Sequence, residues 1–329
     1  ILAGRDAKQL IGSPFVEFVA ERDRPLMREL LKVAEKRGRI ENVIIRLAGS
    51  LGTSVPLSLA GYRLEDFSGH YFLALRAAAS ASPRVPGAGR DAGSGLFDPD
   101  AFSRVATERL RQAREAGDDA ELTLISLPQF DDLRARLDED GEQSLITTLG
   151  ATLRANSLNG DSAAQVGDGR YALVHESAVD ISDLESEIAA VTKELDPTGQ
   201  GVAAETATIE IDEGGVNDED LANGLVYAIN RFKDAKGTDF NIKDFSTNLS
   251  SMVGEAVQSV HAFNAIVEKS QFEVAFHPIL AVDTGEIHHY EALARFDKDG
   301  PNSSPYETIT FAEEVGLIWK FDIAMARKV

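Results

Sequence analysis

The stretch that decides the fold is Gln165–Val174, QVGDGRYALV, in which two runs of strand-forming residues flank a Gly-Asp-Gly corner. Asp and Gly between two such runs are a strong local signal for a tight β-hairpin. We therefore expect two neighbouring antiparallel strands here. Two interpretations of the corner are open at this point: it is either a turn that only joins two strands, or the remains of a catalytic turn whose acid has become Arg170.

The segments around this hairpin alternate between helical and strand patterns. Before it, Asp98 predicts the cap of a helix, residues 121–127 (ELTLISL) predict a strand, and leucines at helical spacing predict a second helix. After it, we expect a helix over 182–195, a strand over 203–211 and a helix that ends before Gly237. This order is typical of a mixed α/β domain with an antiparallel hairpin in its middle.

The first part of the chain has a different pattern. Residues 23–38 (DRPLMRELLKVAEKRG) combine a cap, an early proline, apolar residues at helical spacing and a terminal glycine, so they predict a helix. Three short β-type runs follow within 41–76. Residues 77–93 (AAASASPRVPGAGRDAG) are mostly Ala, Ser, Gly and Pro, which is the composition of a linker. A domain boundary is therefore expected there.

The last part of the chain begins with a helix from about residue 247. It leads to FEVAFHPILAV (272–282), a turn at Asp283-Thr284-Gly285, and EIHHYEALARF (286–296), followed by two helical runs. Strand, turn, strand and helix is how some β/α barrels begin. His288 and His289 are adjacent on the second strand, so we expect their side chains to point to opposite faces and not to hold one metal ion.

Length and charge limit the classes of function. A chain of 329 residues is expected to form two or three domains. The net charge is −21, and residues 1–80 carry a net charge of +3, which leaves −24 for the remainder. That balance argues against nucleic-acid binding, which depends on Lys and Arg at phosphates. The step in charge suggests that different modules are joined.

The sequence contains no membrane-spanning run and no cysteine. No window approaches the roughly 20 apolar residues that cross a bilayer, and the N-terminus lacks a signal pattern. The absence of cysteine excludes disulfides and thiolate chemistry and agrees with a reducing compartment, so we expect a cytoplasmic protein. The sequence starts at Ile1 and ends at Val329 within a helical pattern, which predicts a fragment.

Four ordered blocks in the last part carry a resemblance to a known family. Phe276–Ile279, Asp283–Glu286, Glu291–Phe296 and Phe311–Ile318 resemble the opening of the EAL family, the cyclic di-GMP phosphodiesterases and receptors. The resemblance implies an EAL-type β/α barrel in which Glu291 is a ligand of Mg²⁺ or Mn²⁺.

The resemblance also assigns residues near the bound nucleotide. It implies that Arg295 contacts a ligand phosphate, for which its planar fork is suited. His277 stands where the family usually has Gln, and Ala294 stands where it has a second Leu. These two departures favour a non-catalytic receptor, whereas the retained Glu291 and Arg295 favour an enzyme.

Residues 94–246 resemble a GGDEF domain, the diguanylate cyclase family, through SGLFDPDAF at 94–102 and AAQVGDGRYALV at 163–174. On this resemblance the five signature positions are Gly167, Asp168, Gly169, Arg170 and Tyr171. We expect Gly167 and Gly169 to adopt unusual backbone angles.

The same resemblance implies a cyclase site that has lost its acids. Ser126 and Pro128 occupy the usual aspartate positions, and Arg170 replaces the acid of the turn. Two metal ions on a triphosphate need anionic oxygens, which Ser, Pro and Arg do not supply. The inhibitory product site has Leu158 in place of its arginine, although its aspartate is present as Asp161. GTP binding through Arg170 stays open.

Residues 1–76 resemble the C-terminal two-thirds of a PAS sensor domain, through LIGSPFVEFVAERDRPLMRELL and GHYFLALR. The expected fold is multidomain α/β and α+β. It comprises a PAS-like sheet fragment (1–76), a linker (77–93), a nucleotide-cyclase-like α/β GGDEF domain that is degenerate (94–246), and the N-terminal part of an EAL domain (247–329).

The function implied is cyclic di-GMP signalling. The GGDEF domain would be a catalytically silent regulatory or interaction module, and the EAL domain would hydrolyse cyclic di-GMP in the intact parent, while the chain as given is expected to be inactive. The alternative is a non-catalytic cyclic di-GMP receptor or scaffold protein. Expected partners are cyclic di-GMP, GTP at the degenerate domain, and a second copy or a partner protein.

Overall fold

The computed structural model describes residues 11–48, 54–64, 69–77, 89–209, 218–234, 242–296 and 304–329. No helix within these ranges is long and apolar enough to cross a membrane. The chain divides into two compact units. Ile1–Asp212 with Phe232–Thr247 form the first, and Glu213–Arg231 with Asn248–Val329 form the second.

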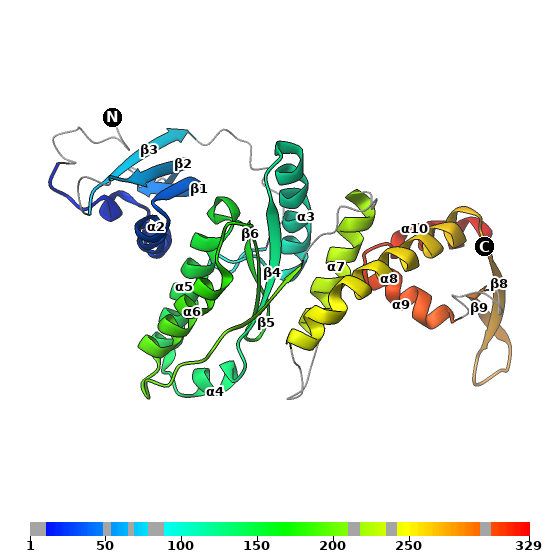
Figure 1. Ribbon diagram of the computed structural model, residues 1–329. Coiled ribbons are helices and arrows are strands. Elements are labelled where there is room, and N and C mark those ends of the chain that lie inside the picture. Colours follow the sequence, from blue (N-terminus) through cyan, green and yellow to red (C-terminus); the bar gives the residue numbers. More distant parts are fainter. Residues whose placement is uncertain are drawn as a thin grey trace. The chain divides into compact units, whose positions relative to one another are not determined.

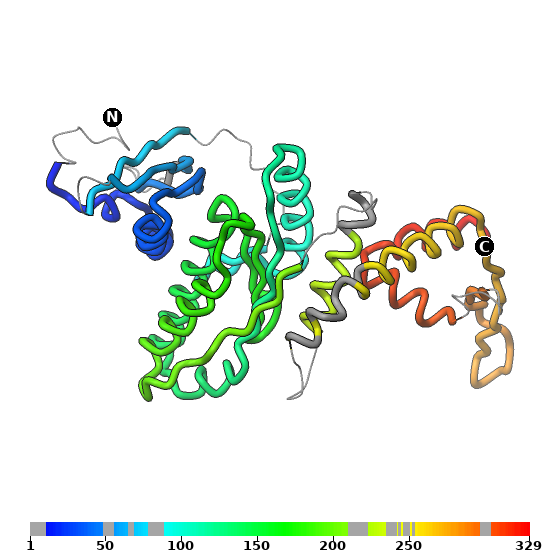
Figure 2. Tube along the Cα trace, in the orientation of Figure 1, coloured from blue at the N-terminus to red at the C-terminus, as the bar shows by residue number. Residues whose placement is uncertain are grey.

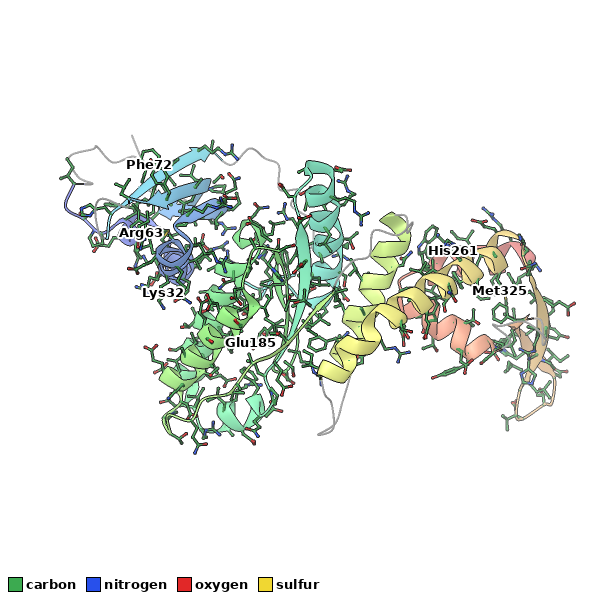
Figure 3. The ribbon with its side chains drawn as sticks, in the orientation of Figure 1. Lys32, Arg63, Phe72, Glu185, His261 and Met325 are labelled. Carbon is green, nitrogen blue, oxygen red and sulfur yellow. The ribbon has the colours of Figure 1, made fainter. Side chains whose placement is uncertain are left out.

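The first unit begins with a helix packed on a three-stranded antiparallel meander. The elements are α2 (Arg24–Arg37), β1 (Arg39–Ala48), β2 (Ser54–Arg63) and β3 (Tyr71–Ala77), in the sheet order β1-β2-β3. Figure 3 labels Lys32 on the helix and Arg63 and Phe72 on the sheet. α2 ends at Gly38, whose φ of +79° suits a residue without a side chain. The predicted helix followed by a meander is confirmed for the described residues; residues 78–88 of the predicted linker lie outside them.

The meander and its helix share one apolar core. α2 turns a single face toward the sheet, because its apolar residues recur at helical spacing. The strands alternate buried and less buried residues, as a sheet covered on one face requires. The largest fully buried side chains of this core are Leu26, Met27, Leu30, Ile45, Leu47 and Leu59.

The rest of the first unit is a four-stranded antiparallel sheet with helices on both faces. Its elements are α3 (Pro99–Ala116), β4 (Ala120–Ser126), α4 (Phe130–Ala135), α5 (Glu139–Asn156), β5 (Ala163–Gly167), β6 (Arg170–Glu176), α6 (Ile181–Leu195) and β7 (Glu205–Ile209). The strand order is β5-β6-β4-β7. Figure 1 shows α5 and α6 on one side of this sheet and α3 on the other. The mixed α/β prediction is confirmed, including the central hairpin β5–β6.

Strand alternation explains why both faces of this sheet are covered. Ile125, Tyr171 and Leu173 lie in the core beneath α5 and α6. Their neighbours Leu124 and Ala172 are also fully buried, although period two turns them to the opposite face. Contacts of α3 with β4, β5 and β6 place that helix over this second face. Glu185 of α6, labelled in Figure 3, accepts a hydrogen bond of 2.6 Å from Thr206 of β7.

The meander and the four-stranded sheet contact each other within the first unit. α2 packs along α5, where Arg37 Nη2 donates to Asn156 Oδ1 at 2.6 Å and Lys36 Nζ donates to Glu187 Oε1 at 2.6 Å. Asn156 Nδ2 donates in turn to Glu187 Oε2 at 3.0 Å. The two sheets are therefore joined by helix packing and by polar side chains.

The second unit contains β8 (Phe272–Leu280), β9 (Ile287–Phe296), α9 (Pro305–Glu314) and α10 (Ile318–Lys328), together with most of α7 (Asp218–Asp234) and α8 (Ile242–Glu268). Figure 2 traces the chain out along β8 and back along β9. The core is aromatic: the Phe321 ring centroid lies 5.0 Å from that of Phe272 and 5.8 Å from that of Phe296. Figure 3 labels His261 on α8 and Met325 on α10.

The predicted strand–turn–strand arrangement followed by two helices is confirmed. Among the described residues, β8 and β9 form a two-stranded antiparallel sheet, and the predicted barrel stays a prediction.

Candidate functional site

The corner between β5 and β6 is a tight turn fixed by one glycine. Gly167 and Arg170 are paired, and Asp168 and Gly169 form the turn. Gly169 has a φ of +61°, and a Cβ there would lie 2.7 Å from Phe130 Cβ. Leu127 N also donates to Gly169 O at 2.8 Å, which holds the corner against the loop after β4.

The expectation that both glycines adopt unusual angles is right for Gly169 and wrong for Gly167. Gly167 has no positive φ, and a Cβ there would be in ordinary van der Waals contact, 3.7 Å from the Arg170 side chain. The physical reason is that this turn requires a left-handed residue at its second position only.

Arg170 binds the end of a helix. Its Nη1 donates to the carbonyl oxygens of Phe232 and Lys233, each at 2.9 Å, and its guanidinium carbon lies 5.7 Å from the centroid of the Phe232 ring. Burial lowers the pKa of Arg170. The last carbonyls of a helix lack partners inside the helix and carry partial negative charge, so a cation stabilises them. The residue at the signature acid position is therefore used to cap α7.

This role predicts a loss of stability when Arg170 is replaced by a long side chain that carries no charge. Arg170→Met is expected to lower the free energy of unfolding by about 1–2 kcal/mol, because two carbonyls lose a cationic donor at a partly exposed site. Arg170→Lys, which keeps the charge, should lose about half as much. Chemical denaturation of the two variants measures this; equal stability of Arg170→Met and the unchanged protein would contradict the capping role.

The other positions implied for a cyclase do not form a metal site in the described structure. Ser126 is buried at the end of β4, opposite Arg170 on one side and Glu205 on the other, and Pro128 is exposed. The Asp168 side chain is 77% exposed, with its Oδ1 3.8 Å from Arg134 Nη1. No group of three or more His, Asp or Glu able to hold a metal occurs in the described part of the chain.

Tyr171 belongs to the core and not to a surface site. It is buried, and its ring meets that of Phe130 edge-on with centroids 6.2 Å apart. Burial raises the pKa of the Tyr171 phenol. Phe130 also contacts the corner at Gly169, so these two rings connect the turn to the core.

The segment of the implied product site is covered by other parts of the first unit. Asp161 Oδ1 pairs with Arg90 Nη2 at 2.6 Å, and the Arg90 guanidinium carbon lies 3.4 Å from the Phe97 ring centroid. Burial lowers the pKa of Arg90. A Cβ on Gly160, whose φ is +63°, would overlap Val43 of β1. Sequence reasoning missed Arg90, because it lies within the predicted linker.

A cleft of about 230 Å³ adjoins this contact. It is bordered by α2 and β1 on one side and by the residues after α5 on the other, including Leu158. Its walls mix apolar side chains with both signs of charge, since Arg37, Arg39, Glu41 and Glu176 are among the lining residues. That mixture selects no class of ligand.

The β8–β9 hairpin places the residues implied for a phosphodiesterase on one exposed face. His277 is directly opposite Glu291, and Glu273 is directly opposite Arg295. All four are exposed, whereas the alternate positions, such as Phe272 and Phe296, are buried against the helices. Glu291 and Arg295 share this face as predicted, about 13 Å apart along the strand.

The expectation that His288 and His289 point to opposite faces is wrong. Their Nδ1 atoms lie 2.8 Å apart, so the side chains meet and do not point to opposite faces. The register of β9 shifts between His289, opposite Ile279, and Ile287, opposite Leu280. His288 is therefore the extra residue of a β-bulge, which breaks the alternation of side chains.

Glu291 fits part of what Mg²⁺ or Mn²⁺ requires. These ions take oxygen ligands, and an exposed carboxylate supplies them. Glu291 lies opposite His277 on the hairpin. The described residues contain no group of three His, Asp or Glu side chains that could hold a metal ion. A complete cation site cannot be assembled from the described residues.

Comparisons with known proteins give distant similarities. No protein-family model matches the sequence. The cyclic di-GMP phosphodiesterase NbdA of Pseudomonas aeruginosa is 23% identical over 248 residues, which cover 72% of this chain and 31% of that protein. The chain thus spans less than a third of the length of this relative.

Two solved structures align with parts of the chain. The GGDEF domain of DgcB from Caulobacter crescentus, in complex with cyclic di-GMP, is 12% identical, covers 43% of this chain and 86% of its own, and has a TM-score of 0.34. The S helix-GGDEF-EAL part of LapD from Vibrio cholerae, bound to cyclic di-GMP, is 11% identical, covers 73% of this chain and 57% of its own, and has a TM-score of 0.30. Scores of this size carry no weight for the fold, which rests on the sheet order, register and cores described above.

Proposed function

We propose that this chain belongs to a cyclic di-GMP signalling protein in which residues 94–246 are a catalytically silent GGDEF-like module and the β8–β9 hairpin opens an EAL-type phosphodiesterase domain. The observation that carries the proposal is the placement of His277, Glu291 and Arg295 on one exposed face of that hairpin. The distant similarity to a curated phosphodiesterase agrees with it.

Each of the three residues has a distinct proposed role. Glu291 contributes one carboxylate to a divalent cation, which when bound activates water for attack on phosphorus. Arg295 offers a planar fork to a phosphate of the substrate. His277, opposite Glu291, is proposed to contact the bound nucleotide.

Glu273 affects the role of Arg295. The two are direct cross-strand partners on the exposed face, and opposite charges in such a pair attract each other. The Arg295 guanidinium itself donates from Nη1 to Ala294 O at 2.9 Å. A non-catalytic receptor stays the alternative because of the departures at His277 and Ala294.

The GGDEF-like module is proposed to be regulatory. A cyclase needs anionic oxygens around two metal ions, and the positions that would supply them are Ser126, Pro128 and Arg170. Arg170 Nη1 is also engaged with two helix carbonyls, so it is not held ready for a triphosphate. We therefore assign this module a role in binding a partner or in transmitting a change in conformation, and none in cyclisation of GTP.

This proposal predicts that the 329-residue chain does not convert GTP to cyclic di-GMP. Incubation with GTP and either Mg²⁺ or Mn²⁺, followed by chromatography, should give no product above a reaction without protein. Product that appears only when residues 94–246 are present would overturn the silent-cyclase part of the proposal.

The phosphodiesterase part is tested with the full-length gene product. Turnover of cyclic di-GMP to a linear dinucleotide supports an enzyme. Binding of cyclic di-GMP without turnover, in the presence of Mg²⁺ or Mn²⁺, supports the receptor instead. If the protein neither binds nor hydrolyses cyclic di-GMP, both the phosphodiesterase and the receptor are refuted.

A further inference from the structure

The bulge in β9 brings two imidazoles together on the surface of the hairpin. His288 Nδ1 and His289 Nδ1 are 2.8 Å apart, while the ring centroids are 5.1 Å apart and the ring planes meet at 80°. The two nitrogens are much closer together than the ring centres, so they lie on the facing edges of the rings. Both side chains are exposed to solvent.

Two facing imidazole nitrogens suit a divalent transition-metal ion. Neutral imidazole is a good ligand for Zn²⁺, Cu²⁺ and Ni²⁺, whereas Mg²⁺ prefers oxygen. A tetrahedral Zn²⁺ ion with Zn–N bonds of about 2.0–2.1 Å needs its two nitrogens roughly 3.4 Å apart. The observed pair must open by about 0.6 Å, which exposed side chains achieve by small rotations about their χ angles.

We propose that His288 and His289 form a two-histidine site for a divalent transition-metal ion, with Zn²⁺ as the ion that the ligands favour and water in its remaining positions. Without metal, one Nδ1–H donates to the other Nδ1, which accounts for the contact distance. The site does not depend on the proposed phosphodiesterase activity. It also differs in ligand type from the oxygen-ligated cation proposed at Glu291.

The bulge is the feature that makes the site. On a regular strand, neighbouring side chains point to opposite faces and cannot share an ion. The extra residue His288 removes that alternation at this one point. His289 is opposite Ile279, which supplies no ligand, so the two imidazoles are the metal-binding groups of the bulge.

The test is isothermal titration of the 329-residue chain, prepared without a histidine tag, with Zn²⁺. The chain is expected to bind one Zn²⁺ ion at the pair. His288→Gln and His289→Gln should each weaken that binding at least tenfold, because each removes one of two ligands. His261→Gln is the matched control, since His261 is also exposed but lies on α8, and the Zn²⁺ affinity of this variant should change less than twofold.

Circular dichroism and thermal unfolding establish that the variants are folded, which is expected because all three side chains are exposed. Unchanged Zn²⁺ affinity in both His288→Gln and His289→Gln would overturn the proposal. Absence of stoichiometric Zn²⁺ binding by the unchanged chain would also overturn it. An equal loss in His261→Gln would show a different set of ligands and would refute the two-histidine site.

Discussion

Replacement of Glu291 by alanine is expected to lower hydrolysis of cyclic di-GMP by the full-length gene product at least about 100-fold. Loss of a residue that only supports a metal ligand costs roughly 10–100-fold, so loss of a direct carboxylate ligand should cost at least the upper end of that range. The exposed position of Glu291 means that the variant should fold normally. The measurement is the initial rate of linear dinucleotide formation at saturating Mg²⁺ or Mn²⁺.

Glu286→Ala provides the control for this variant. Glu286 is an exposed carboxylate in the turn of the same hairpin, outside the paired strands. Its removal changes the net charge as Glu291→Ala does and should leave the rate within about twofold, since the lost charge is screened by solvent. Equal rates for Glu291→Ala and Glu286→Ala would refute the role of Glu291 as a cation ligand.

Gly169→Ala is expected to reduce the free energy of unfolding of the first unit by about 2–5 kcal/mol. An alanine must adopt the left-handed angle of +61°, at roughly 1–2 kcal/mol. Its Cβ must also displace Phe130, whose Cβ would be 2.7 Å away, and overpacking of this kind costs about 1–3 kcal/mol. Chemical denaturation followed by circular dichroism measures the change.

The other glycine of the corner is the matched control. Gly167 has no positive φ and has room for a methyl group, so Gly167→Ala should change stability by less than about 1 kcal/mol. A similar loss in both variants would show that the corner is sensitive to any side chain, contrary to the geometry described for Gly169. A negligible loss in Gly169→Ala would show that Phe130 moves aside freely.

Local features of the fold could be predicted from the sequence because their causes lie within a few residues. Asp98 caps α3 by accepting a hydrogen bond of 2.7 Å from Ala101 N, and the Asp-Gly turn joins β5 to β6. The shared face of Glu291 and Arg295 follows from the period of two in a regular stretch of strand. These predictions required only spacing and turn chemistry.

Features set by distant parts of the chain could not be predicted in this way. The partners of Arg170 are 62 and 63 positions further along the chain, and Asp161 pairs with Arg90 across 71 positions. The bulge at His288 depends on the register of the opposite strand, because nothing in the sequence of β9 marks an extra residue. Prediction of the site was therefore right for residue spacing and incomplete for residue contacts.

The contact between Val43 and Gly160 has an evolutionary consequence. The space next to Gly160 is filled by a side chain from a strand 117 positions earlier, and Gly160 itself has a left-handed backbone. Descendants of this sequence can therefore gain a side chain at residue 160 only if residue 43 shrinks in the same lineage. Residues 43 and 160 are therefore expected to vary together in related sequences that keep both the meander and the four-stranded sheet.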